Sequence, residues 1–120
     1  MRISLGKRGE DLAVEKLKTL GYEIVTRNFR CTSGEIDVIG LHHEIWVFIE
    51  VRTRRGKKFG TPEESVTLRK KQHLLAAAQT YLQDNALHEV NWRIDFVAVE
   101  LSPKGELLRV DVIENAINEQ

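Results

Sequence analysis

The stretch GEIDVIGLHHEIWVFIEVR, residues 34–52, decides how this chain is expected to fold. Two apolar runs flank a polar turn, and this pattern predicts a β-hairpin. Acidic residues interrupt the runs at Glu35, Asp37 and Glu50, and Arg52 follows close behind. A buried carboxylate is costly unless a partner compensates it. The fold therefore depends on what these charges meet inside the hairpin.

The pairing of the two strands predicts which charges meet. Residues two apart in a strand share a face, so the turn sets Asp37 opposite Glu50 and Glu35 opposite Arg52. Two adjacent carboxylates repel unless a cation lies between them or one is protonated. Mg²⁺ would resolve the repulsion, because it takes carboxylate and carbonyl oxygens and keeps several waters. A structural ion network, with Glu35 paired to Arg52 and other bases on the remaining acids, explains the spacing equally well.

The rest of the chain predicts the element order α-β-β-β-α-β-β, an α/β fold with a mixed sheet in one domain over residues 1–120. Ser4 and Thr67 are the expected caps of the two long helices. The second of these is expected to bury a stripe of Leu68, Leu75, Ala78 and Leu82. The expected elements are a helix over 4–20, strands over 22–29, 35–39 and 45–53, a short helical turn opened by 61–64, a helix over 67–85, and strands over 91–101 and 107–113.

Composition indicates an ordinary globular protein. The 120 residues are 42% hydrophobic and 30% charged, and Cys31 is the one cysteine, which suits a reducing compartment. No run of about 20 apolar residues and no signal-peptide pattern occurs in the sequence. We expect a soluble cytoplasmic protein without a membrane partner.

The charges are unevenly distributed although the formal net charge is zero. Residues 31–51 carry four acids and no Lys or Arg, whereas residues 52–73 carry eight bases and two acids. An acidic cluster followed directly by a basic one favours contact with a polyanion. A solvated basic surface is the competing interpretation.

The residues also resemble a known group of enzymes. The block GEID, followed about a dozen residues later by FIEVRTR, resembles the D…E-x-K signature of the PD-(D/E)xK nucleases, which include restriction endonucleases and Holliday-junction resolvases. Over most of its length the chain is similar to the YraN family of small bacterial proteins assigned to that group. The further blocks that carry this similarity are GKRGEDLAVEKLKTLGYEIVTRNFRC, KKFGTPEESVTLRKKQ and RIDFVAV.

This resemblance implies a restriction-endonuclease-like core, α-β-β-β-α-β, with an extra C-terminal strand here. It implies a Mg²⁺ or Mn²⁺ ion held by Asp37, Glu50 and the carbonyl of Val51. Arg52 stands where active nucleases usually carry Lys, and a guanidinium effectively never loses its proton. In resolvase-like members a glutamate of the first helix joins the site, and Glu10 is the matching residue.

Other residues are secondary expectations. Glu35 is an outer acid or the partner of Arg52, and Gln72 is a weak helical candidate. His42 and His43 are expected as exposed turn residues, and Asp95 as a structural partner of Arg93. The residues expected to contact a phosphate backbone are Arg54, Arg55, Lys57, Lys58, Arg69 and Lys70.

Three functions follow from these observations. The first is a metal-dependent nuclease that acts on DNA, on branched or damaged forms in particular. The second is a catalytically inactive nucleic-acid-binding module on the same fold, with Arg52 marking lost chemistry. The third is an adaptor that binds protein and keeps the acids as a structural network. The resemblance to resolvases also implies a homodimer.

Overall fold

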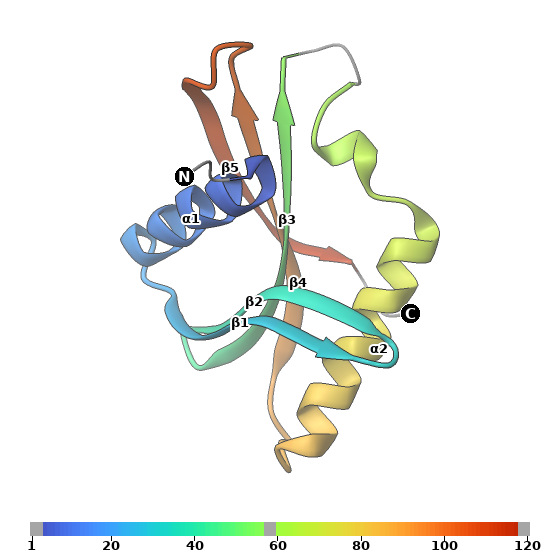
Figure 1. The fold of residues 1–120 in the computed structure, drawn as a ribbon. Helices are drawn as coiled ribbons and strands as arrows, with labels where there is room; N and C mark the ends of the chain where they lie inside the picture. The colour runs from blue at the N-terminus through green and yellow to red at the C-terminus, as the bar shows by residue number, and fades with distance from the viewer. Residues whose placement is uncertain (1–3, 57–59, 118–120) are drawn as a thin grey trace.

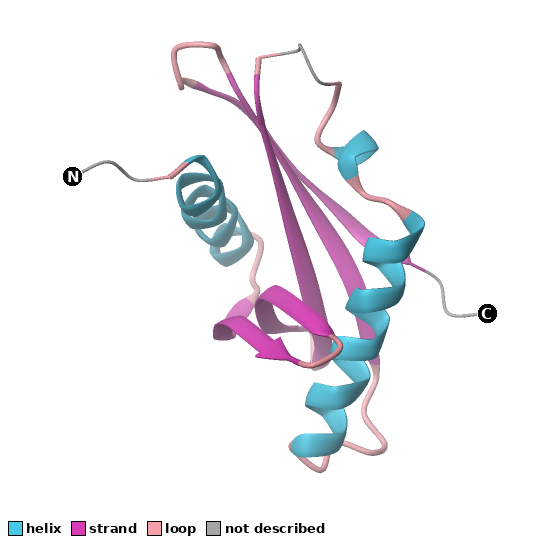
Figure 2. Ribbon diagram, turned by 45° about the vertical axis from the view of Figure 1, so that its right-hand side comes forward, coloured by secondary structure: helices cyan, strands magenta, loops and turns pink. Residues whose placement is uncertain are grey.

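The computed structural model describes residues 4–56 and 60–117, and in this part of the chain five strands form one sheet between two helices (Figures 1 and 2). The predicted mixed α/β fold and element order are confirmed. The elements are α1 (Leu5–Thr19), β1 (Glu23–Cys31), β2 (Gly34–His42), β3 (Ile45–Arg55), the 3₁₀ turn η1 (Glu63–Ser65), α2 (Leu68–Asp84), β4 (Trp92–Leu101) and β5 (Leu107–Ile117).

The helices begin where the sequence predicts caps. The hydroxyls of Ser4 and Thr67 each accept a backbone N–H from the first turn of α1 and α2. Thr61 and Glu64 form a reciprocal capping box at η1, in which each side chain accepts the other's backbone N–H at 3.2 and 2.9 Å. Neither α1 nor α2 is long and apolar enough to cross a membrane.

The strands follow the order β1-β2-β3-β4-β5. All neighbours are antiparallel except β3 and β4, which run parallel because α2 carries the chain back across the sheet. The β2–β3 hairpin closes more tightly than expected, since His42 pairs with Ile45 and leaves a two-residue turn. His43 and Glu44 both have positive φ, at 51° and 67°, as the favoured two-residue hairpin turn requires.

Two apolar cores cover the two faces of the sheet. Val47 and Ile49 of β3 face α1, and Phe48 between them faces α2. The predicted stripe of α2 is wrong at its first residue, because Leu68 is 72% exposed. The first turn of α2 lies beside charged residues, since Lys70 approaches Glu50, and the buried part of the helix begins only at Leu74. The buried residues of α2 are Leu74, Ala77, Ala78, Tyr81 and Leu82.

The prediction that His42 is an exposed turn residue is wrong. His42 is buried, stacks on Tyr22 with ring centroids 4.0 Å apart, and lies 2.9 Å from an Arg93 nitrogen. Arg93 also binds the fully buried Asp95 at 2.9 Å, as predicted, and the Tyr22 hydroxyl donates to Asp95 at 2.7 Å. His42 is the last residue of β2, and its ring turns inward. It packs on Tyr22 and contacts Arg93, and so covers the polar group that these two residues form with Asp95.

The close contact between α1 and β3 gives a stability prediction. A Cβ added at Gly9 would collide with the Thr53 side chain, whereas one added at Gly6 would meet nothing within 4 Å. In a helix interior, Gly→Ala ordinarily stabilises by up to about 1 kcal/mol. We therefore expect Gly6→Ala to raise the free energy of unfolding and Gly9→Ala to lower it by about 1–3 kcal/mol.

Urea or guanidinium unfolding of the two variants measures this difference. The two substitutions make the same chemical change in the same helix, so each is the control for the other. A Gly9→Ala protein as stable as Gly6→Ala would contradict the packing of α1 on β3.

Candidate metal centre

The candidate site lies where β2 leaves β3. Their pairing runs from His42 opposite Ile45 to Val38 opposite Ile49 and then stops, while β3 continues to Arg55 beside β4 alone. At this point a carboxylate oxygen of Asp37 accepts the backbone N–H of Val51 at 2.8 Å. The Val51 N–H is thus bound by the side chain of Asp37 instead of by a backbone carbonyl of β2. Because the N–H and C=O of a paired residue face the same neighbour, the carbonyl of Val51 lies on this same edge.

The backbone is irregular on the other side of Asp37 as well. The β1–β2 ladder pairs Arg27 with Val38 and Phe29 with Ile36, but it omits the intervening pair, Asn28 and Asp37. Asn28 has a positive φ of 58°, a conformation that Asn tolerates better than most residues. Asp37 is therefore held at a local break in both ladders, and the sequence pattern gave no sign of the role of Asn28.

Glu50 is the buried member of the pair. It follows Phe48 on the α2 side of β3, and only 2% of its surface is exposed. Burial, the charge of Asp37 and a hydrogen bond between the two carboxyls together raise the pKa of the Glu50 carboxyl to about 8, with burial the largest cause. The charges of Lys70 and Arg52 act in the opposite direction but are the smaller influences. The structure thus brings Asp37 and Glu50 together, as predicted.

Two cations approach the same oxygen of Glu50. The Arg52 Nη1 lies 3.3 Å from Glu50 Oε2, and the Lys70 Nζ lies 3.6 Å from it. Arg52 is also fixed by Ser65, whose hydroxyl accepts Nε–H at 2.8 Å and whose carbonyl accepts Nη2–H at 3.4 Å. Arg52 therefore ties β3 to η1.

A second arginine, on β5, holds η1 in place. Arg109 of β5 donates from its two Nη atoms to the two carboxylate oxygens of Glu63, at 3.1 and 2.9 Å. The same guanidinium binds Glu100 at 2.8 Å and Asp111 at 2.7 Å. This contact holds the Glu63 pKa below its ordinary value and keeps Ser65 over Arg52. Because 46 residues separate Glu63 from Arg109, local sequence patterns carry no sign of it.

The predicted partnership of Glu35 with Arg52 is wrong. Glu35 is exposed and lies 3.4 Å from Arg30 of β1, while Arg52 is engaged by Glu50 and Ser65. The reason is that β2 diverges from β3 before Glu35, so the register that would have set it opposite Arg52 is never reached.

Glu10 of α1 contacts β1 of the β1–β2 hairpin. It accepts from Arg27 at 2.8 Å and from Asn28 at 3.2 Å, and Arg27 supplies its counter-charge. Within the described residues no group of three or more Asp, Glu, His or Cys side chains is arranged to hold a metal ion, so Glu10 does not form a triad with Asp37 and Glu50.

The predicted phosphate-contacting residues separate into different surroundings. Arg55 donates to the Pro103 carbonyl at 2.9 Å, and the buried Nε of Arg54 has no hydrogen-bond partner in the part of the chain that the structure describes. Lys57 and Lys58 lie outside the described residues. On α2, Arg69 and Gln72 are exposed.

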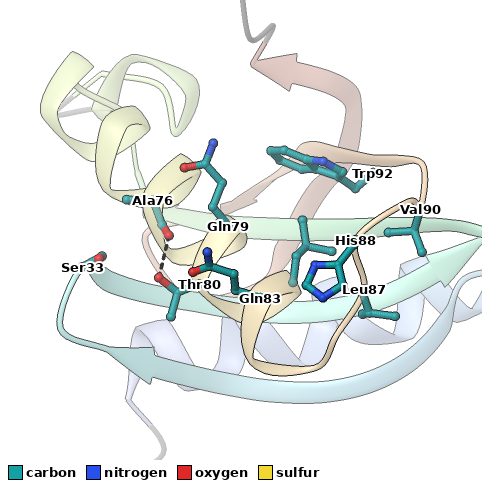
Figure 3. A pocket seen from close by; sticks show the side chains of 10 residues that line it. Ser33, Ala76, Gln79, Thr80, Gln83, Leu87, His88, Val90 and Trp92 are labelled. Carbon is teal, nitrogen blue, oxygen red and sulfur yellow. Dashed lines mark hydrogen bonds between the residues drawn. The ribbon is translucent and has the colours of Figure 1, made fainter.

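Two cavities differ in their relation to the acids. One of about 210 Å³ adjoins the site and is lined by Val51, Arg52 and Thr53 together with the first turn of α1. A larger one, about 650 Å³, runs along the C-terminal half of α2, with Gln79, Trp92 and their neighbours around it (Figure 3). No Asp or Glu is among the described residues that line this larger cavity, so its volume does not identify it as the metal site.

The donor set at β3 fits a hard divalent cation. Asp37 and Glu50 supply two adjacent carboxylates, and the Val51 carbonyl lies on the edge that Asp37 occupies. Mg²⁺ needs only one or two carboxylates from protein because it keeps several waters. Burial and the neighbouring Asp37 charge raise the Glu50 pKa despite the opposing charges of Lys70 and Arg52, and a divalent ion bound between the two carboxylates would favour their ionised forms.

Comparison with known proteins assigns the chain to a family. Residues 9–99 match the uncharacterised protein family UPF0102. This chain belongs to the UPF0102 family. It is 48% identical to a UPF0102 protein of Dehalococcoides mccartyi, over 99% of this chain and 97% of the relative. UPF0102 proteins of Caldicellulosiruptor saccharolyticus and Dictyoglomus turgidum are 45% and 39% identical, each over 93% of this chain and 95% of the relative.

UPF0102 membership confirms the resemblance to YraN-like proteins that the sequence shows. The matched residues include both candidate metal ligands, Asp37 and Glu50, and the cations at positions 52 and 70. The family match therefore covers the complete candidate site.

The Glu50 pKa predicts how stability depends on pH. Its folded-state value of about 8 exceeds its ordinary value of 4.5, so the folded state holds an extra proton between these pH values. The free energy of unfolding therefore falls as pH rises through this window, by about 1.4 kcal/mol for each unit of pKa difference. Glu50→Gln stays neutral, so we expect its stability relative to wild type to increase by about 1–3 kcal/mol between pH 5 and pH 8.5.

Denaturant unfolding at several pH values, with a chelator present, measures this change. Glu44→Gln, which removes an exposed carboxyl from the same hairpin, is the matched control and should follow the wild-type curve. Parallel curves for wild type and Glu50→Gln would contradict the raised pKa.

Proposed function

We propose that this UPF0102 protein is a metal-dependent nuclease that hydrolyses phosphodiester bonds in DNA. The observation that carries the proposal is the buried Glu50 carboxyl set against Asp37, at the point where β2 leaves β3. A buried carboxyl beside a second, partly buried one is costly to keep without a cation between them. Binding of a divalent cation would explain why this unfavourable arrangement is present. The motif resemblance to PD-(D/E)xK nucleases supports metal-dependent hydrolysis of a phosphodiester.

The buried Asp95 shows what a structural carboxylate looks like in this protein. It accepts four hydrogen bonds, between 2.7 and 3.2 Å, from Tyr22, Arg93 and the backbone of Asn115. Glu50 instead has cations at 3.3 and 3.6 Å and another carboxyl beside it. If Glu50 served only the stability of the fold, we would expect it to accept a similar set of short hydrogen bonds to those of Asp95.

The reaction requires a nucleophile, a charge clamp on the phosphate and departure of a sugar oxygen. When bound by Asp37 and Glu50, Mg²⁺ or Mn²⁺ supplies the Lewis acidity that polarises the phosphate and makes water more nucleophilic. The oxygen of water forms a new bond to phosphorus as the bond to one sugar oxygen breaks. One proton of the water leaves with the sugar hydroxyl and the other passes to solvent or stays on the phosphate.

The protein's own residues position the reacting groups. The Val51 N–H fixes Asp37, and Arg52 lies against Glu50 with Ser65 behind it. Arg52 offers fixed positive charge to a non-bridging phosphate oxygen. Arg69 and Lys71, on either side of Lys70 at the α2 N-terminus, would contact the phosphate backbone beyond the site. A DNA substrate and a free Cys31 both suit the cytoplasm.

An inactive nucleic-acid-binding module is the second candidate, and the immobilised Arg52 favours it. Arg52 cannot act as a base, and its hydrogen bonds to Ser65 restrict its movement. This function predicts salt-sensitive DNA binding without strand cleavage.

Cleavage assays separate the two functions. Purified protein is incubated with a four-way junction, a nicked duplex and a single strand of DNA, in Mg²⁺ or Mn²⁺. We expect cleavage of at least one substrate, lowered by about 100-fold or more in Asp37→Asn and Glu50→Gln because the ion loses a ligand. Calorimetric titration with Mn²⁺ should show weaker binding to both variants.

Glu44→Gln is again the control, since it removes a carboxyl from the hairpin without touching the pair. DNA binding without cleavage of any substrate would favour the inactive module. Unaltered Mn²⁺ binding in Asp37→Asn would refute the metal centre itself.

A further inference from the structure

The two cations beside Glu50 come from different elements, Arg52 from β3 and Lys70 from α2. We infer that Lys70, at the start of α2, supplies the mobile amine of this site, and that Arg52 is a positioning residue. This inference rests on the proposed nuclease function and assigns a catalytic residue to it. The argument starts from what each of the two cations touches.

Arg52 is committed to structure. Three of its nitrogens have protein partners: Nε and Nη2 bind Ser65, and Nη1 lies 3.3 Å from Glu50. Ser65 is in turn held within η1, which the fork of Arg109 fastens to the sheet through Glu63. Moving the Arg52 guanidinium toward a substrate would break this chain of contacts. Its geometry suits holding Glu50 and η1 together.

Lys70 has the opposite character. Its backbone is fixed, because its N–H donates to the capping hydroxyl of Thr67 at 3.2 Å. Its side chain is 37% exposed, and its Nζ lies 3.6 Å from Glu50 Oε2, beyond the 2.7–3.2 Å of a well-formed hydrogen bond. The ammonium thus faces the acid pair from the solvent side on a flexible stem. An ammonium carries three donors that can follow a ligand, unlike a rigid guanidinium fork.

The neighbours of Lys70 do not share this placement. Arg69 and Lys71 point about 100° away around the helix, and within the described residues no ion pair joins either of them to an acid. The basic cluster therefore divides into one residue directed at the acid pair and two directed elsewhere. Lys70 had been expected to contact the phosphate backbone, and this geometry gives it a different task.

That task is to hold the attacking water or a non-bridging phosphate oxygen beside Asp37 and Glu50. The hydrogen bond from the Lys70 ammonium strengthens as negative charge develops on that oxygen. The bonds that form and break are those of the hydrolysis already described, and Lys70 donates a hydrogen bond without being consumed. No further reactant is needed.

The test moves the amine from one element to the other. Lys70→Gln should lower the turnover rate with saturating DNA by about 100-fold or more, because one donor to the developing charge is lost. The double variant Arg52→Lys with Lys70→Gln should recover a substantial part of that loss, since it places an amine on β3 next to Glu50. A side chain that only supported the fold would not be replaced from another strand.

Matched controls and a second readout complete the experiment. Arg69→Gln and Lys71→Gln remove the adjacent charges and should weaken DNA binding. Lys18→Gln removes an exposed charge at the far end of α1 and should leave the rate at saturation unchanged. Calorimetry should show that Lys70→Gln binds Mn²⁺ at least as tightly as wild type, because a positive charge near the ion has been removed.

The outcomes distinguish this inference from the proposed function. Wild-type protein that cleaves no substrate overturns both. Wild-type cleavage with Lys70→Gln within about threefold of it overturns the role of Lys70 alone. Loss of Mn²⁺ binding in Lys70→Gln, or a double variant no faster than Lys70→Gln, likewise assigns Lys70 to structure.

Discussion

One hydrogen bond, from the Val51 N–H to the Asp37 carboxylate, determines the shape of the site. It ends the pairing of β2 with β3 by giving the next backbone donor of β3 to a side chain. The β1–β2 hairpin can then turn away while β3 continues beside β4 to Arg55. An unpaired edge next to two carboxylates results. A full ladder would have covered this edge with the backbone of β2 and closed the entrance that the proposed function requires.

The polar groups of the protein follow two different designs. The group around Asp95 is closed: its hydrogen bonds are short, its charges are matched, and His42 covers it. The group around Glu50 is open: its cation contacts are longer, and burial together with a neighbouring carboxyl raises the Glu50 pKa. Asp95 and Glu50 are both buried, so burial does not explain the difference between the two groups. The difference comes from whether the surrounding elements complete the coordination of the carboxylate.

The sequence predicted what depends on local pattern and register. Capping residues located both helices, and alternation in two apolar strands set Asp37 against Glu50. Predictions failed where tertiary geometry intervenes. Glu35 missed Arg52 because the strands separate first, and Leu68 stayed exposed because the core ends before the first turn of α2. The contact of Lys70 with Glu50 depends on how a helix lies across a sheet, which strand alternation does not report.

The bidentate contact of Arg109 with Glu63 has a consequence for the order in which the chain folds. It joins the last strand to the short turn that carries Ser65, across 46 residues of sequence. A contact of such separation forms late, because the loop entropy must be overcome before the contact contributes. During synthesis, Asp37 and Glu50 can therefore meet well before Arg109 has left the ribosome. Until β5 forms, η1 lacks the Arg109 contact that fastens it to the sheet, although Ser65 is already available to bind Arg52.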